Sequence, residues 1–281
     1  MKTNGYSTDR MPPGNRYRES FMEIYLAGVR GSISSPMQTQ EYRSKLKKIL
    51  ALALQSGIKE EQIHNFILSL PPELKNIVGG NTTCVGVSGT ETDHIIIDCG
   101  SGIRHLGDKL MKGPLGQGKG TAHIFITHTH WDHIQGFPFF KPAYIPGNKL
   151  HFYSIFPDLK ERMQQQQDSR FFPVHFDHMP SEKFYHTLAF NQEYKLLGYH
   201  IRCHPLKHPG GSTAYRFAEG NHSFIFATDA EFTGEDLSYT EGNDFFFNAD
   251  LLIIDAQYTL DESFQKFDGG IQVLQWLSTV P

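Results

Sequence analysis

The sequence is poor in the features that mark membrane-spanning, secreted or disulfide-linked proteins. It contains no run of about 18 apolar residues, the length that a transmembrane helix requires. The first twenty residues are polar and lack the apolar stretch of a secretory signal. Three cysteines in 281 residues, an odd number, give no disulfide framework. We therefore predict a protein of a reducing, cytoplasmic setting with no membrane partner.

Positive charge is also scarce. The 26 lysines and arginines are outnumbered by 30 acidic residues, which gives a net charge of −4. Proteins that hold long nucleic acid by its phosphates carry the opposite balance, so this partner is not expected. The 39% hydrophobic and 20% charged content is typical of a folded globular protein. Against this background the 15 histidines stand out, because histidine is the commonest metal ligand and the usual acid–base at neutral pH.

Apolar periodicity divides the chain into an early helical stretch and a longer region of short strands. After an opening strand at 22–30, apolar residues recur at three- and four-residue spacing in two runs, which predicts a helical insertion at about 39–71. We expect this hairpin to pack on the domain; a lid or a dimer contact is the alternative. From Gly79 onwards, short apolar runs alternate with helical candidates after Gly102 and from Asp158. We predict one α/β domain over residues 1–281.

The strongest functional signal is the segment THTHWDHIQGFP, which follows an apolar strand. It places His128, His130, Asp132 and His133 within six positions. Side chains two apart share a face, so His128 and His130 point the same way, and the following turn can direct the other two back toward them. Such a group would fill a core poorly, because each member needs a polar partner when buried. Its natural partner is a cation such as Zn²⁺, so the segment predicts a metal site.

His-x-His-x-Asp-His after a hydrophobic strand resembles the signature of the metallo-β-lactamase superfamily. Other landmarks of that family follow in order: Asp98 in IIIDCGSG, His208 in PLKHPGGSTAYRF and Asp229 in FIFATDAEF. The resemblance covers about residues 22–258. It implies an α/β fold, a four-layer αβ/βα sandwich with two sheets inside and helices outside.

The resemblance also implies two divalent metal ions per chain, with zinc expected and manganese or iron as alternatives. The implied ligands are His128, His130 and His208 for one metal, Asp132 and His133 for the second, and Asp229 between them. Asp98 would fix the histidine loop by hydrogen bonds. The implied reaction is two-metal hydrolysis by a metal-bound hydroxide. Asp132, which would orient or deprotonate the water, and Asp229 are the candidate catalytic residues.

The context of the motif resembles the phosphodiesterase-like branch, which includes the cyclic phosphodiesterases and the tRNA 3′-processing nucleases. The similar segments are VRGS, GGNTTCV at 79–85 and HPGGSTAYRF at 208–217. Four residues of the last segment are candidate phosphate contacts through N–H, hydroxyl or guanidinium groups, namely Gly211, Ser212, Thr213 and Arg216. A tight turn into the next strand is the alternative explanation of this segment.

The expected substrate is a small, cyclic nucleotide-like phosphodiester, because the chain is acidic and lacks the glycine- and proline-rich arm of tRNA nucleases. The alternatives are a metallo-hydrolase of a carbonyl ester, thioester or lactam, and a non-catalytic metal-binding member of the fold. Relatives are often dimers, so the resemblance also allows a homodimer.

Other histidines have simpler explanations. His123, in the strand before the motif, is expected to face a helix. His175 and His178 are expected on a surface loop, with the mouth of the site as the alternative. His204 is close enough to His208 for a substrate contact, and the cysteines are expected to be small buried hydrophobes.

The C-terminal sequence departs from the family pattern. The family completes its second metal site with a last histidine near the C-terminus, whereas the final histidine here is His222. Phosphodiesterase-like relatives continue after a segment such as DAQYT (255–259) to Trp-Gly-His-Ser or Trp-Gly-His-Thr. Here FDGGIQVLQWLSTVP follows, and restoring one base to a suitable reverse translation yields Phe-Asp-Trp-Gly-His-Thr. We therefore predict a frameshifted tail at 269–281, an incomplete C-terminus and an impaired second metal site.

Overall fold

Six strands form the first sheet of the computed structural model, which describes residues 22–77, 79–230 and 244–255. Along the sheet they follow chain order: β1 (Ile24–Gly28), β2 (Cys84–Val87), β3 (Asp93–Ile97), β4 (Thr121–Phe125), β5 (Lys149–Ser154) and β6 (Glu182–Thr187). The first three strands are antiparallel, and β3 to β6 are parallel. Parallel neighbours need crossover connections. These contain α4 (Ile103–Leu110), α5 (Trp131–Ile134) and α6 (Leu159–Gln166), which cover one face of the sheet.

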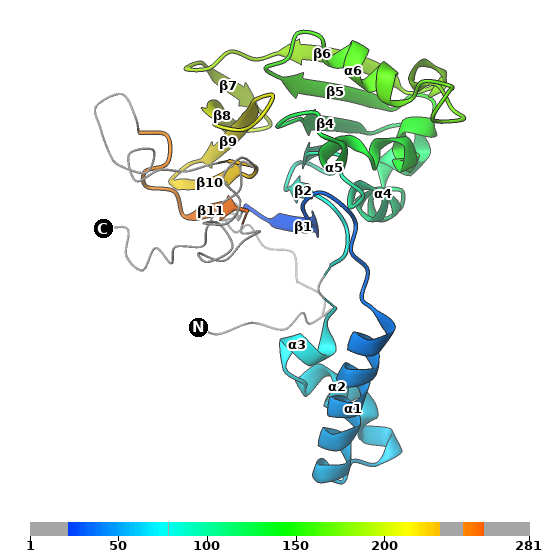
Figure 1. Ribbon diagram of the computed structural model, residues 1–281. Helices are drawn as coiled ribbons and strands as arrows, with labels where there is room; N and C mark the ends of the chain where they lie inside the picture. Colours follow the sequence, from blue (N-terminus) through cyan, green and yellow to red (C-terminus); the bar gives the residue numbers. More distant parts are fainter. Residues whose placement is uncertain (1–21, 78, 231–243, 256–281) are drawn as a thin grey trace, which may run out of the picture.

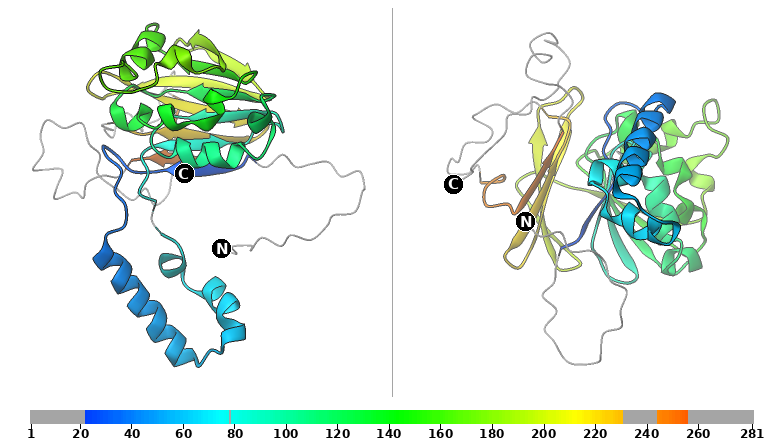
Figure 2. Two further views of the ribbon diagram at one scale, coloured as in Figure 1. Left: turned by 90° about the vertical axis from the view of Figure 1, so that its right-hand side faces the viewer. Right: turned by 90° about the horizontal axis from the view of Figure 1, so that it is seen from below.

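The second sheet contains five strands and faces the first (Figure 2). Its order is β11 (Leu251–Ile254), β10 (His222–Ala227), β9 (Ser212–Glu219), β8 (Tyr199–Leu206) and β7 (Glu193–Leu196). The pair β10–β11 is parallel and the other pairs are antiparallel.

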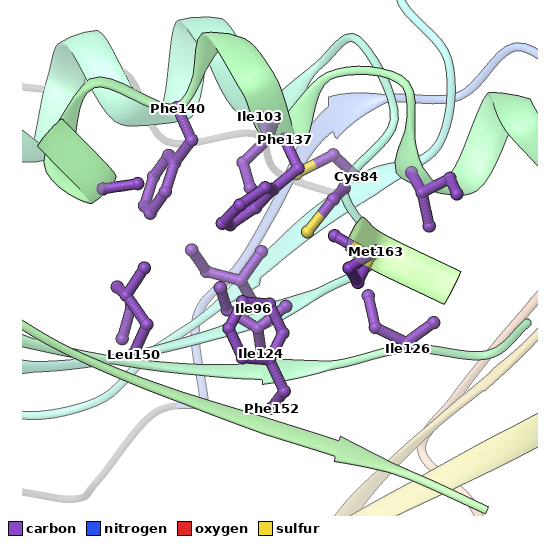
Figure 3. Close-up of a cluster of buried hydrophobic side chains, with 14 of the residues drawn as sticks. Cys84, Ile96, Ile103, Ile124, Ile126, Phe137, Phe140, Leu150, Phe152 and Met163 are labelled. Atoms are coloured by element: carbon purple, nitrogen blue, oxygen red, sulfur yellow. The ribbon is translucent and has the colours of Figure 1, made fainter. Parts of the chain in front are cut away.

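Alternation along the buried strands creates two cores on opposite faces of the first sheet. Ile96, Ile124 and Phe152 pack under the helices with Phe137 and Met163 (Figure 3). The side chains between the two sheets come from both of them and include Ile95, Ile97, Phe125, Tyr215 and Phe217. The predicted α/β sandwich is therefore confirmed. Within the described residues, the outer face of the second sheet is covered by the 244–250 segment rather than by a helix.

The helical insertion forms an arm that projects from the sandwich (Figures 1 and 2). It contains α1 (Thr39–Ser56), a 3-10 turn at Glu60–Gln62, α2 (Ile63–Ser69) and α3 (Pro72–Lys75). The carboxylate of Glu41 accepts the backbone N–H of Gln38 at the start of α1, and Gly57 ends the helix with φ +57°. The expectation that this hairpin packs on the domain is wrong. No residue of α1, α2 or α3 is buried, because the arm projects away from both sheets (Figures 1 and 2).

Most predicted strands and helices are present, but β6 and β7 were not predicted. Their sequences, EKFYHT and EYKL, alternate between exposed and half-buried residues at a sheet edge, and neither contains an apolar run. All three cysteines are buried, as expected. Among the described residues, no helix combines the length and apolarity needed to span a bilayer. The predicted frameshifted tail at 269–281 lies outside the described residues.

Candidate metal centre

The histidine motif leaves the carboxyl end of β4, where the loops of parallel strands meet. His128 follows the strand by three residues, and His130 occupies the N-cap position of the short helix α5. Asp132 and His133 lie inside that helix and are buried. The hydroxyl of Tyr215 donates to the carbonyl of Ile126 (2.7 Å), which ties the second sheet to the root of this loop.

Asp98 positions the histidine loop from the end of β3. Its Oδ1 accepts the backbone N–H of Thr127 (2.8 Å), and its Oδ2 accepts the Thr127 hydroxyl (2.8 Å). The same Oδ2 lies 2.8 Å from Nδ1 of His133. A carboxylate can only accept, so Nδ1 of His133 carries a hydrogen and Nε2 is the nitrogen that faces the centre. Asp98 is fully buried, and its contacts are those of the positioning role expected for it.

The first ligand group contains His128, His130 and His208, whose donor nitrogens lie within 4.8 Å of one another. Nδ1 of His130 is 3.0 Å from Nε2 of His208. Tetrahedral coordination of zinc at about 2.0–2.1 Å would separate two nitrogens by about 3.3 Å. His208 reaches this position from the end of β8, so the first site joins the two sheets.

The second ligand group contains His128, His133 and Asp229. Asp229 follows β10, and its Oδ1 lies 3.2 Å from Nε2 of His133. Its Oδ2 lies 3.9 Å from Nε2 of His128 and 3.8 Å from Nε2 of His208. The carboxylate thus lies between the two groups, where a bridging ligand would be.

Asp132 borders the second group but has a further partner. Its Oδ2 lies 3.5 Å from Nε2 of His133 and accepts the backbone N–H of Ser32 (2.7 Å). Ser32 belongs to the segment that connects β1 to the arm, so a predicted metal ligand is hydrogen-bonded to the root of the arm.

The donor set fits divalent cations. Nε2 of His128 and Nε2 of His133 are buried and have no hydrogen-bond partner within the described part of the chain. Burial lowers the pKa of His128 to about 2, so its ring is neutral, as a ligand must be. Burial opposes ionisation of Asp229, but its contact with His133 and the charges of the neighbouring histidines together lower its pKa to about 2. Burial opposes protonation of His133, yet the charges of Asp98 and Asp229 raise its pKa. A cation would replace that proton.

Comparison with known proteins agrees with this geometry. A sequence profile described as "Beta-lactamase superfamily domain" matches residues 93–277. The chain belongs to the β-lactamase superfamily. Its family is that of metal-dependent hydrolases with the metallo-β-lactamase fold, which confirms the resemblance seen in the sequence.

Two solved structures show the same fold. The metallo-β-lactamase fold protein YhfI from Bacillus subtilis is 15% identical, with 85% of this chain and 73% of that chain covered and a TM-score of 0.54. The short form of human tRNase Z is 16% identical, with 90% and 85% covered and a TM-score of 0.51. No curated protein sequence matches the chain.

The candidate phosphate contacts of this superfamily member are only partly brought to the centre. The turn from His208 to Gly211 is closed by a hydrogen bond between Gly211 N–H and the His208 carbonyl (2.8 Å), and a Cβ on its Gly210 would lie 3.7 Å from Nε2 of His130. The Ser212 hydroxyl donates to the carbonyl of Thr228 (3.3 Å). Thr213 is fully buried, and its hydroxyl has no partner in the described ranges.

Arg216 does not reach the metal centre. Its guanidinium donates to the carbonyls of Phe245 (2.7 Å) and Phe247 (2.6 Å) and to the Ser223 hydroxyl (3.0 Å). These bonds hold the 244–250 segment against β9 and β10. The phosphate role expected for Arg216 is therefore replaced by a structural one. His204 likewise stacks on Phe245, with ring centroids 4.9 Å apart.

The sequence reasoning missed two residues near the site. Asp255 follows β11, and burial together with the charge of Asp229 raises its pKa to about 6. Its signal was present, since an apolar strand ending in aspartate also produces Asp98 and Asp229. Arg162 of α6 donates to the hydroxyl of Thr129 in the histidine loop (3.0 Å). No local pattern reveals that contact.

A second histidine cluster lies within strands β4, β5 and β6 of the first sheet. His123 stacks on His151 at 5.1 Å, and Nδ1 of His151 lies 2.9 Å from Nε2 of His186. The expectation that His123 faces a helix is wrong, because it shares the face of Phe125, which packs between the sheets. His175 and His178 lie at a short 3-10 turn, and the ring of His175 accepts a hydrogen bond from the backbone N–H of Asp177.

Proposed function

We propose that the protein is a metal-dependent hydrolase of small phosphodiesters, such as cyclic nucleotides, with two divalent cations per chain. The observation that carries this proposal is the pair of ligand groups that share His128, with Asp229 between them. Two cations held about 3.5–4 Å apart are the usual apparatus for in-line displacement at phosphorus. His130 and His208 would complete the first site, and His133 the second.

Residues of the chain position the metal ligands and the attacking water. Bound divalent cations lower the pKa of water and polarise phosphoryl oxygens. Asp98 keeps the lone pair of His133 directed at the centre through its contact with Nδ1. The Ser32 N–H fixes one oxygen of Asp132, which leaves the carboxylate oriented to hold a proton of the attacking water.

Arg30 supports an anionic substrate. It lies two residues before Ser32, whose N–H contacts Asp132, and its side chain is exposed. Across the described ranges, its guanidinium makes no hydrogen bond or ion pair. We therefore assign to Arg30 the charge contact that Arg216 does not provide, because a guanidinium can bind two oxygens of one phosphate.

A substrate panel tests the proposal. The protein, loaded with zinc or manganese, is assayed with bis-p-nitrophenyl phosphate, cyclic nucleotides, a thioester, a lactone and a chromogenic lactam. We expect turnover of the phosphodiesters, and we expect Arg30→Gln to raise KM for them, whereas Arg104→Gln on α4 is the control. Turnover of carbonyl substrates alone would reassign the enzyme to carbonyl hydrolysis. A protein with no metal and no turnover would be a binding member of the fold.

A further inference from the structure

The arm exposes an apolar stripe that nothing in the described chain covers. Tyr42, Leu46, Leu50 and Leu54 follow one another at four-residue spacing on α1, so they form one line along the helix. Their exposed fractions are 57%, 40%, 53% and 84%. We call these four residues the arm stripe. Further exposed apolar side chains lie on α2, at Ile63, Ile67 and Leu68.

The arm has little apolar packing of its own, because Leu70, between α2 and α3, is the one buried residue among its described residues. Polar contacts close its base, where Nζ of Lys45 contacts the carbonyl of Asn76 and Nζ of Lys75 donates to the carbonyl of Leu68. Most helical stability in proteins comes from packing of an apolar face. Because α1 has 18 residues and none of them is buried, we expect a partner to cover its stripe.

We propose that this partner is the arm stripe of a second copy of the chain, packed antiparallel about a two-fold axis. An isologous contact needs one self-complementary patch, which the stripe supplies. The helix is about 27 Å long and the two limbs of the hairpin are together about 20 Å wide, a footprint of about 500 Å². Side chains project from this footprint, so the accessible area that it buries is larger than about 500 Å² and approaches the value of about 800 Å² per partner in specific interfaces.

Charge selects the second copy and its direction. The half of α1 near the sandwich carries Arg43, Lys45, Lys47 and Lys48 against Glu41, whereas the tip of the arm carries Glu60 and Glu61 against Lys59. An antiparallel pair places the basic half of each arm opposite the acidic tip of the other. A parallel pair would oppose like charges. An anionic bilayer fits less well, because the acidic tip is the part of the arm that extends furthest from the sandwich.

Disulfide trapping tests the contact directly. The three native cysteines are buried, so a cysteine introduced on the arm can be oxidised selectively. Leu50→Cys lies close to the middle of the arm stripe and therefore near the two-fold axis. We expect mild oxidation of this variant to yield a covalent dimer. Lys48→Cys, on the opposite face of the same helix, is the matched control and is expected to remain monomeric on a non-reducing gel.

Molar mass in solution provides an independent measurement. The full chain is expected at twice 32.0 kDa, and Leu50→Glu at 32.0 kDa. Because position 50 is exposed, the variant should keep the circular dichroism and hydrolytic activity of the parent. A monomeric wild type overturns the inference, whether its stripe binds phosphatidylglycerol vesicles or is covered by residues 256–281. A dimer that persists in Leu50→Glu overturns it too. Neither result bears on the proposed reaction.

Discussion

The two histidine clusters, one beyond the carboxyl end of β4 and one within strands β4 to β6, differ in what surrounds the rings. At the carboxyl ends, the metal centre combines its histidines with Asp132 and Asp229 and leaves buried nitrogens without a partner. Within strands β4 to β6, His151 stacks on His123 and on His186 and pairs with His186 through nitrogen, whereas Nδ1 of His123 contacts the Tyr153 hydroxyl. Histidine density alone therefore does not identify a metal site. Buried nitrogens without a partner do, within the described residues.

Burial acts on both clusters but with different consequences. It lowers the pKa of His128 to about 2 in the metal centre and, together with the charge of His123, lowers the pKa of His151 to about 4 in the other cluster. The ring of His128 has a buried nitrogen without a partner in the described residues, to which a cation can bind. The ring of His151 already has His186 as a partner, so a fall in pH, rather than a cation, is expected to change its charge.

The largest difference between the clusters should appear when one exposed histidine is removed from each. His130→Ala is expected to lower both metal content and turnover by more than the about 10–100-fold that loss of an outer partner of a ligand costs. His186→Ala, in the other cluster, should leave both unchanged. Metal analysis and hydrolysis of bis-p-nitrophenyl phosphate measure the two effects. Full metal content and activity in His130→Ala would contradict the proposed difference between the two clusters.

A smaller effect is expected from the carboxylates at the two ends of β3. Asp98→Asn replaces the acceptor of the His133 Nδ1 hydrogen and should weaken the second metal by about 10–100-fold. Competition with a chromogenic chelator measures that affinity. Asp93→Asn, at the other end of the strand beside His123, is the control. An equal loss in both variants would show that the Asp98 effect comes from stability of the strand.

The smallest effect concerns acid stability. The pKa of a histidine is about 6.5 in an unfolded chain. Since the pKa of His151 falls to about 4 in the folded protein, its contribution to stability is present above pH 6.5 and is lost as the pH drops toward 4. His151→Phe, which can still stack on Phe184, should therefore show a smaller decrease in Tm between pH 7 and pH 5. His64→Phe on the arm should retain the parental decrease.

The sequence predicted the metal centre far better than its surroundings. His128, His130, Asp132 and His133 come from one continuous loop, so their proximity follows from local geometry. Asp98, His208 and Asp229 lie far apart along the chain, and only the resemblance to a family brought them together. The direction of Arg216 depends on carbonyls of the 244–250 segment, which no spacing in the sequence reveals.

The arm shows the same limit. The periodicity of α1 predicts an amphipathic helix, but it does not say which surface the apolar face meets. That depends on the short segments that join the arm to β1 and β2, and they direct the arm away from the sheets.

Three residues at the metal centre have left-handed backbone conformations although none is glycine: Ser32 (φ +63°), Asp98 (φ +59°) and Asp229 (φ +57°). Such a conformation costs an L-residue about 1–2 kcal/mol. The packed sandwich supplies that free energy when the chain folds, before any cation arrives. The Ser32 N–H is therefore already bonded to Asp132, Asp98 already orients His133, and Asp229 already lies between the ligand groups, so the affinity for a cation is not reduced by work on the backbone.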